Sequence, residues 1–177
     1  MGQSERRLSK KVCLLGDFAV GKTSLVRRYV EGRFDERYLS TIGVKVDRKV
    51  LHVQGPGGVV IVSVMLWDLA GGPTIGPVSP SYYRGAAAAV IVCDLTRPET
   101  LDGSGRYAEG FLAANPGAPW ILAANKADLV EERLVSEESL EEAAASHGVP
   151  LVVTSARTGE QVESLFERLG MLLVQAA

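Results

Sequence analysis

The stretch Gly16-Asp17-Phe18-Ala19-Val20-Gly21-Lys22-Thr23 matches the pattern G-x-x-x-x-G-K-[ST] in full. The apolar segment 12–15 leads into it and the segment 24–29 follows with helical spacing, so the motif lies between a predicted strand and a predicted helix. Glycines let the main chain curl until successive N–H groups point inward, and the following helix adds the positive end of its dipole. The sequence therefore predicts a phosphate-binding loop at residues 16–23.

Two side chains of this loop carry most of its chemistry. Lys22 would bring a full positive charge to the β- and γ-phosphates, and Thr23, the first hydroxyl after the lysine, is placed to ligate Mg²⁺. The residues expected to contact nucleotide here are Asp17, Phe18, Ala19, Val20, Gly21, Lys22, Thr23 and Ser24. The alternative is an ordinary glycine turn before a helix, with Gly-Lys-Thr present by chance, and the flanking strand and helix disfavour it.

The composition is that of one globular domain. The chain has 177 residues, of which 46% are hydrophobic and 23% are charged, and this is enough apolar content for a substantial core. We expect a flexible segment at residues 1–9 and a single domain at residues 10–177. The net charge of −2 gives no electrostatic reason to expect nucleic acid or an anionic membrane as a partner.

The sequence predicts a cytoplasmic protein without a membrane span. No apolar run approaches the roughly 20 residues that cross a bilayer, and no signal-peptide pattern opens the chain. Cys13 and Cys93 lie inside apolar runs, which favours buried thiols in a reducing compartment over a disulfide. We expect no lipid anchor, because Arg6 stands where a myristoylation signal has Ser or Thr and the carboxyl end has no cysteine to prenylate.

The hydrophobic pattern alternates between strand and helix along the chain. Residues 54–58 are a turn signal that joins two strands into an antiparallel hairpin at the edge of an otherwise parallel sheet. Strands are predicted at 11–15, 44–53, 59–67, 87–95, 119–125 and 150–155, and helices from the phosphate loop to about residue 30 and at 99–114, 136–147 and 160–175. This alternation predicts a doubly wound α/β fold that binds its ligands at the carboxyl ends of the strands.

The run Trp67-Asp68-Leu69-Ala70-Gly71 ends the third predicted strand. An aspartate after an apolar strand is placed to hold Mg²⁺ directly or through water, which makes Asp68 a candidate metal ligand. Gly71 has no side chain and can bring its N–H against a terminal phosphate. The motif is weak by itself, because an aspartate in a strand-to-loop turn is common.

A second pair of loops indicates which base is bound. Asn125-Lys126-Ala127-Asp128 follows the fifth predicted strand, and the Asp128 carboxylate can accept two hydrogen bonds from N1–H and N2–H₂ of guanine, which adenine does not offer. Asn125 can tie this loop to the phosphate loop, and the Lys126 stem can lie over the base. After the sixth strand, Ser155 and Ala156 complete the set, with the Ala156 N–H placed to donate to guanine O6. A solvated turn is the simple alternative.

These motifs together resemble the Ras superfamily of small GTPases over residues 10–175, and Tyr82-Tyr83-Arg84-Gly85-Ala86 resembles the Rab branch. The resemblance implies a three-layer P-loop NTPase fold of class α/β, with a six-stranded, mostly parallel sheet, one antiparallel edge hairpin and helices on both faces. It also implies that Thr41 ligates Mg²⁺ and senses the γ-phosphate, that Phe34 packs against the guanine, and that Tyr38 covers the phosphates. Phe34 and Tyr38 could otherwise be simple anchors of a polar loop.

The sequence departs from this family at the position that orients the attacking water. Members that hydrolyse GTP efficiently have glutamine where this chain has Gly72, and Phe18 replaces a small residue in the phosphate loop. Prolines in residues 73–80 make a regular helix improbable there. The predicted catalytic set is therefore Lys22, Thr41 and Gly71, with Gly72 at the usual glutamine position, and we expect slow hydrolysis. Drift in a surface loop is the alternative explanation.

The sequence leads to a Rab-like switch that binds GTP or GDP with Mg²⁺, held by Thr23, Thr41 and Asp68, and hydrolyses GTP slowly. Protein effectors, a GTPase-activating protein and an exchange factor are expected to bind through the switch regions. One alternative is a GTP-binding interaction module with negligible turnover. An ATP-using P-loop protein is a weaker one, which Asp128 disfavours.

Overall fold

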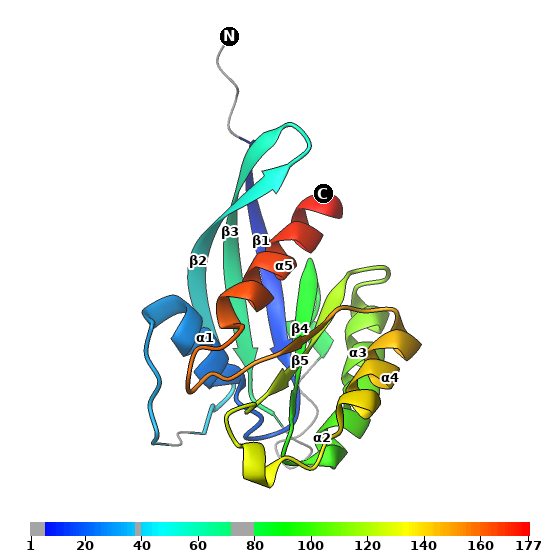
Figure 1. Ribbon diagram of the computed structural model, residues 1–177. Helices are drawn as coiled ribbons and strands as arrows, with labels where there is room; N and C mark the ends of the chain where they lie inside the picture. The colour runs from blue at the N-terminus through cyan, green and yellow to red at the C-terminus, as the bar shows by residue number, and fades with distance from the viewer. Residues whose placement is uncertain (1–5, 38–39, 72–79) are drawn as a thin grey trace.

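The computed structural model describes residues 6–37, 40–71 and 80–177, which form a six-stranded sheet with helices on both faces (Figure 1). The strand order is β2-β3-β1-β4-β5-β6, and every pair is parallel except β2 with β3. The strands are β1 Arg6–Leu15, β2 Val44–Gly55, β3 Gly58–Leu69, β4 Ala88–Asp94, β5 Trp120–Asn125 and β6 Leu151–Val153. The predicted fold class and edge hairpin are confirmed.

Alternate residues of the central strands enter two separate cores. Val12 and Leu14 of β1 face the core that the sheet shares with α1 and α5, whereas Cys13 and Leu15 face the core on the other side. Because both faces are covered, β1 is apolar throughout residues 12–15 and β4 throughout residues 88–93, before β4 ends at Asp94. The helices are α1 Lys22–Glu31, α2 Pro98–Asp102, α3 Ser104–Ala114, α4 Glu137–His147 and α5 Val162–Gln175, with short 3₁₀ turns η1 Pro80–Tyr82 and η2 Val130–Glu132.

The amino-terminal boundary differs from the prediction. β1 begins at Arg6 and not at Lys11, because residues 6–9 pair in parallel with β3, from Arg6 opposite Val60 to Ser9 opposite Ser63. The prediction of a frayed segment is therefore wrong for residues 6–9, while residues 1–5 lie outside the described residues. The mostly polar side chains of residues 6–9 show no strand pattern in the sequence. Main-chain pairing with a long neighbouring strand does not require apolar side chains.

Two further boundaries were also predicted wrongly. The helix expected at residues 99–114 is two helices that meet at Gly103, where the Ser104 hydroxyl donates to the Leu101 carbonyl at 2.6 Å and competes with the main-chain ladder. β6 ends at Val153, before the predicted residue 155, because the Ser155 N–H turns to the carbonyl of Glu160 at 3.1 Å.

The topology gathers five loops at one edge of the sheet, at the bottom of Figure 1. The loops after β1, β3, β4, β5 and β6 all leave the carboxyl ends of mutually parallel strands, which is where ligands bind in such sheets. Among the described residues, no helix has the length and apolar character needed to cross a membrane. Cys13 and Cys93 are buried free thiols, and burial raises their pKa to about 11 and about 12 respectively.

Candidate functional site: a nucleotide pocket at the carboxyl edge

The phosphate loop between β1 and α1 has a backbone that only certain residues tolerate. Gly16 and Gly21 have φ of 141° and 104°, and a Cβ at either would collide, with the Val92 carbonyl and with the Asn125 amide respectively. Ala19 also has a positive φ of 61°. Gly21 precedes α1 and supplies no side-chain cap, so the N–H groups of the first turn of the helix are left for another acceptor. This is the backbone expected of an anion site.

Lys22 is buried beside this loop. Its ammonium donates to the carbonyls of Gly16 and Asp17, each at 2.8 Å. Burial lowers the pKa of Lys22 to about 8, although Asp68 and Asp17 favour the charged form. A Cβ at Gly71 would collide with the Lys22 ammonium and lie 2.6 Å from the Gly16 carbonyl oxygen, so only glycine fits there. The predicted approach of Gly71 to the phosphate position is consistent with this crowding.

Three oxygen-bearing side chains meet next to Lys22. Thr23 Oγ1 lies 2.5 Å from Asp68 Oδ2 and 2.6 Å from Thr41 Oγ1. Asp68 is buried, and among the described residues its second oxygen, Oδ1, has no hydrogen-bond partner. Burial also raises the pKa of Asp68, although the Thr23 hydroxyl and the charge of Lys22 favour its ionised form. A hard cation such as Mg²⁺ prefers this donor set, and an orphaned buried carboxylate oxygen is what it would satisfy. The residues therefore fit the metal.

Elsewhere in the described ranges, no group of three or more His, Cys, Asp or Glu side chains is placed to hold a metal ion. The oxygen cluster of Thr23, Thr41 and Asp68 has a single carboxylate. A divalent cation there would need further oxygen ligands from phosphate and water, which is the way Mg²⁺ is usually bound in phosphate sites.

Asn125 ties the base loop, residues 125–128, to the phosphate loop. Its amide Nδ2 donates to the Val20 carbonyl at 3.0 Å, which confirms the predicted tie. Its Oδ1 accepts from Thr154 Oγ1 at 3.2 Å and from the Ala156 N–H at 3.1 Å. The Ala156 N–H, predicted to donate to guanine O6, thus donates to Asn125 in this structure. Asn125 is 2% exposed, so these contacts are protected from water.

Asp128 is oriented by its neighbour Ser155. The Ser155 hydroxyl donates to Asp128 Oδ1 at 2.7 Å and accepts from the Thr158 N–H at 3.1 Å. Lys126 has a left-handed backbone, with φ of 70°, which turns the chain between Asn125 and Asp128. The loop after β6 thereby sets the direction of the carboxylate that was predicted to read the base.

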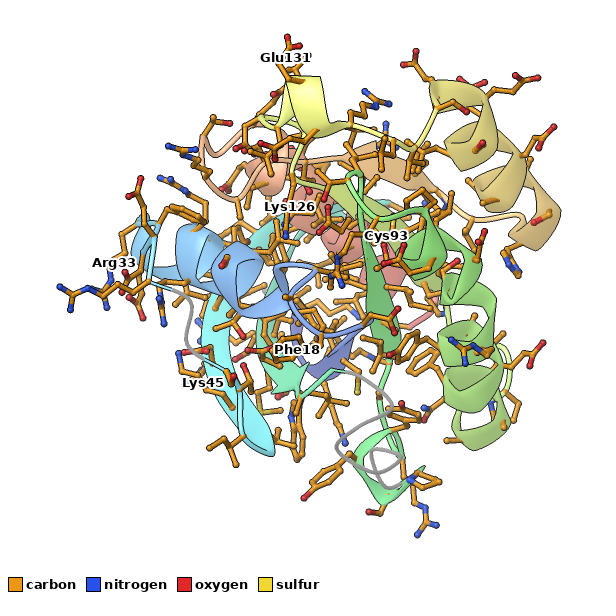
Figure 2. The ribbon with its side chains drawn as sticks, turned by 90° about the horizontal axis from the view of Figure 1, so that it is seen from below. Phe18, Arg33, Lys45, Cys93, Lys126 and Glu131 are labelled. Carbon is orange, nitrogen blue, oxygen red and sulfur yellow. The ribbon has the colours of Figure 1, made fainter. Side chains whose placement is uncertain are left out.

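Two adjoining cavities run along these loops. The phosphate-side cavity is lined by Lys22, Thr23, Thr41 and Gly71, and the base-side cavity by Asn125, Asp128 and Ala156. The residues that line both are Gly21, Ser24, Phe34, Glu36 and Lys126. They form one elongated site with a phosphate end and a base end. In the view from below, Phe18 and Lys126 lie near the centre of this edge, and Arg33 and Lys45 lie at its periphery (Figure 2).

Most of the predicted site residues are brought together here. Phe18 and Ala19 line the phosphate-side cavity, whereas the Val20 side chain is fully buried in the core and offers only main-chain atoms. Tyr38 and Gly72 lie outside the described residues. Their predicted roles stay predictions.

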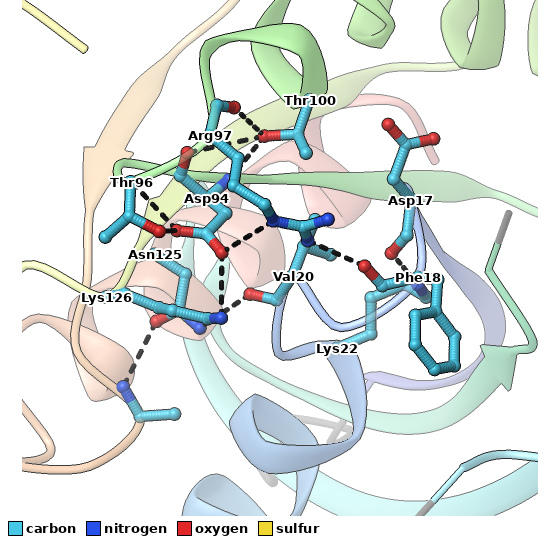
Figure 3. Close-up of polar contacts among 11 residues, drawn as sticks. Asp17, Phe18, Val20, Lys22, Asp94, Thr96, Arg97, Thr100, Asn125 and Lys126 are labelled. Carbon is cyan, nitrogen blue, oxygen red and sulfur yellow. Dashed lines mark hydrogen bonds and ion pairs between the residues drawn. The ribbon is translucent and has the colours of Figure 1, made fainter. Parts of the chain in front are cut away.

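Three residues of this site were missed by the sequence reasoning. Asp94 ends β4 and accepts from Lys126 and from Arg97, and Arg97 reaches the phosphate loop (Figure 3). Tyr107 of α3 donates its hydroxyl to Asp17 Oδ1 at 2.7 Å. One signal was available for Asp94, because a carboxylate at the end of a fully apolar strand repeats the pattern of Asp68. Arg97 and Tyr107 carry no such signal.

Comparisons with known proteins point the same way as the geometry. The model of the Ras family matches residues 11–175. The chain is 37% identical to the Ras-related protein Rab5A of Oryza sativa over 166 residues, covering 93% of this chain and 80% of that protein. It is 34% identical to the Ypt/Rab-type GTPase YPT7 of Saccharomyces cerevisiae over 179 residues, covering 97% and 85%, and 37% identical to Ras-related protein Rab-31 of Rattus norvegicus over 158 residues, covering 89% and 79%.

Proposed function

We propose, since this chain belongs to the Ras family and is a Rab-like small GTPase, that it binds GTP and GDP in the elongated site and hydrolyses GTP slowly when no partner is bound. Members of this family are GTP-binding switches that convert GTP to GDP and phosphate. The observation that carries the assignment of residues is the tie of Asn125 to Val20 at 3.0 Å, because it joins a phosphate-binding loop to a carboxylate-bearing base loop.

The phosphate end supplies positioning and charge. The Lys22 ammonium, now 2.8 Å from two loop carbonyls, would turn to the β- and γ-phosphates and stabilise the charge that develops there. Thr23, Thr41 and Asp68 would hold Mg²⁺. When bound, this ion supplies neutralisation of the phosphate charge. Gly71 would present its N–H to the γ-phosphate at a place too crowded for any side chain.

The base end supplies selection. Ser155 fixes one oxygen of Asp128, and the carboxylate would accept two hydrogen bonds from N1–H and N2–H₂ of guanine. Adenine offers neither donor, so its nucleotides would leave a carboxylate unpaired. The stem of Lys126 and the ring of Phe34, both lining the base-side cavity, would cover the base. This argues against the ATP-using alternative.

Slow hydrolysis follows from what this chain lacks. Glycine at position 72 has no side chain with which to orient an attacking water, although the charge stabilisation by Lys22 remains. Phe18 is 43% exposed and lines the phosphate-side cavity, so it also occupies space that a partner's arginine would need. GTP hydrolysis is accelerated mainly by two features, a group that positions the attacking water and an arginine supplied by a partner. The arginine alone contributes roughly 10³–10⁵-fold.

Protein partners would read the state of the switch regions. Ile42 is 91% exposed next to Thr41, so its apolar side chain is available to a partner when Thr41 is held in place. We therefore propose effectors, a GTPase-activating protein and an exchange factor as partners, and a cytoplasmic location. The altered residues 73–80 predict weak binding to standard Rab effectors.

The first experiment identifies the nucleotide that accompanies the purified protein, by chromatography after denaturation. Recovery of GDP supports the switch with turnover, recovery of GTP favours an interaction module with negligible turnover, and recovery of adenine nucleotides contradicts the assignment. Protein with Lys22→Ala, purified in parallel, is the control and should retain none.

The second experiment measures phosphate release in a single turnover of GTP with Mg²⁺. The wild-type protein should be slow, and Gly72→Gln should be faster by about tenfold or more, because it restores a side chain able to orient water. Wild-type turnover equal to that of glutamine-containing relatives would contradict the role given to Gly72.

A further inference from the structure

Arg97 binds the phosphate loop through the main chain of that loop. It lies in the turn between β4 and α2, and its Nη2 donates to the Phe18 carbonyl at 2.6 Å (Figure 3). Neither cavity, as the described residues line it, includes Arg97 or Asp94. Arg97 therefore acts on the loop backbone and not on the ligand directly.

Asp94 connects this arginine to the base loop. Asp94 Oδ2 lies 3.1 Å from Arg97 Nε and 2.8 Å from the ammonium of Lys126. The carboxylate is 1% exposed, whereas the side chains of Arg97 and Lys126 are 34% and 30% exposed. A carboxylate removed from water in this way depends on the two cations for its stabilisation, so loss of either one would leave it less well compensated.

The remaining contacts of Asp94 fix its orientation. Its Oδ1 accepts from the Thr96 N–H at 2.8 Å and from Thr96 Oγ1 at 2.7 Å. Burial alone would raise the pKa of Asp94, but the hydrogen bonds from Lys126 and Thr96 hold it below its usual range. Asp94 is also the direct strand neighbour of Asn125, so the carboxylate and the base loop share one rigid pair of strands.

We propose that Arg97 and Asp94 are positioning residues that hold the phosphate loop and Lys126 in one frame and thereby slow the release of guanine nucleotide. The chain of contacts runs from the Phe18 carbonyl through Arg97 and Asp94 to Lys126. It presets a loop carbonyl at one end and the lysine stem at the other, so less conformational freedom remains to be lost on binding. This proposal rests on the function proposed above.

The geometry requires arginine specifically. Arg97 uses Nε for Asp94 and Nη2 for Phe18 at the same time, and the rigid fork of a guanidinium spans the two acceptors. Lysine in this position would keep the charge, but its flexible stem lacks the rigid fork that holds Asp94 and the Phe18 carbonyl in one fixed arrangement. Charge and bridging can therefore be separated by experiment.

The test follows the release of GDP that carries an N-methylanthraniloyl group, displaced by excess GDP. Arg97→Gln and Arg97→Lys should both release it about tenfold faster than wild type, the factor expected for loss of one charge-assisted hydrogen bond. The matched control is Arg106→Gln, an exposed arginine of α3, which should release at the wild-type rate. Wild-type release from Arg97→Lys would show that charge alone suffices and would overturn the proposal.

A double-mutant cycle tests the link through Asp94. Asp94→Asn should also accelerate release about tenfold, and the double variant with Arg97→Gln should stay well below the roughly hundredfold product of the two effects. A full product would mean that the two residues act independently, which would overturn the link. Because Asp94 is buried, the thermal unfolding midpoint of each variant is measured, and the Arg97 variants decide the proposal if Asp94→Asn does not fold.

The two proposals fail differently. If the wild-type protein takes up no labelled GDP, the proposed function is wrong and this inference falls with it. If the wild-type protein binds GDP but Arg97→Gln releases it at the wild-type rate, only this inference is wrong.

Discussion

The phosphate loop and the exposed segment that follows α1, residues 33–37 and 40–43, both line the phosphate end of the pocket. They differ in how firmly the rest of the fold holds them. In the phosphate loop, side chains from the rest of the fold hold the carbonyls, with Arg97 on Phe18 at 2.6 Å and Asn125 on Val20 at 3.0 Å. In the exposed segment, the ion pair Arg27–Asp35 spans 3.7 Å with the Asp35 side chain 39% exposed. The pair Arg157–Glu36 spans 3.5 Å with both side chains more than half exposed.

This difference supports separate roles for the two segments: nucleotide binding for the phosphate loop, and detection of the γ-phosphate for the exposed segment. Exposed ion pairs contribute only about 0–1 kcal/mol each, so the exposed segment is held weakly at its surface. Within this segment, Thr41 is joined to the phosphate end by a hydrogen bond, because its hydroxyl lies 2.6 Å from that of Thr23. A rigid loop gives affinity because it is preorganised, whereas a weakly held segment can change position when the γ-phosphate is lost.

The largest effect should come from the rigid loop. Lys22→Ala removes the buried ammonium that faces the phosphates and should weaken GDP and GTP binding by about 100-fold or more, because charge-assisted hydrogen bonds contribute more than neutral ones. Calorimetric titration of nucleotide-free protein measures it. A loss of less than about threefold would contradict the contrast between the two segments, since the phosphate loop would then contribute little to nucleotide affinity.

The base loop should show an equally specific effect. Asp128→Asn should weaken GDP binding by about 100-fold and should improve binding of xanthosine diphosphate, because an amide can donate to the C2 carbonyl of xanthine. Competition between the two diphosphates measures it. Unchanged preference for guanine would remove Asp128 from base recognition.

The protonation of Lys22 predicts a pH dependence on the rigid side. Its pKa is about 8 without ligand and rises when phosphates bind, so nucleotide affinity should fall about tenfold between pH 7 and pH 9 as binding comes to require proton uptake. In the unfolded chain the pKa returns to 10.5, so this group makes the nucleotide-free protein more stable as pH rises from 8 to 10.5. Titrations in two buffers of different ionisation enthalpy measure the uptake, and its absence at pH 9 contradicts the prediction.

The smallest effect should come from the exposed segment and should depend on nucleotide state. Thr41→Ala removes one hydroxyl of the oxygen cluster and should speed GTP release by less than about tenfold while GDP release stays unchanged. Ile42→Ala, which changes an exposed neighbour, is the control. Equal effects on GTP and GDP would mean that this segment binds nucleotide in both states and senses neither.

Local sequence patterns were enough to predict the two loops. The spacing of Gly16, Gly21 and Lys22 predicted the loop, and the structure has positive φ at both glycines, a conformation that glycine adopts without a Cβ penalty. The place of Asp68 and Asn125 at the ends of apolar strands followed from the rule that parallel strands end at one edge. The strand formed by residues 6–9 was missed because its side chains carry no apolar pattern.

The prediction of which residues bind phosphate and base came from the sequence, since each motif is short and is read along the chain. Only the tertiary structure decided what supports them. Arg97 lies 79 residues from Phe18, and Tyr107 lies 90 residues from Asp17, so neither contact leaves a pattern in the nearby sequence. Such pairs exist because the sheet order puts β1 beside β4, and this adjacency is a property of the packed fold.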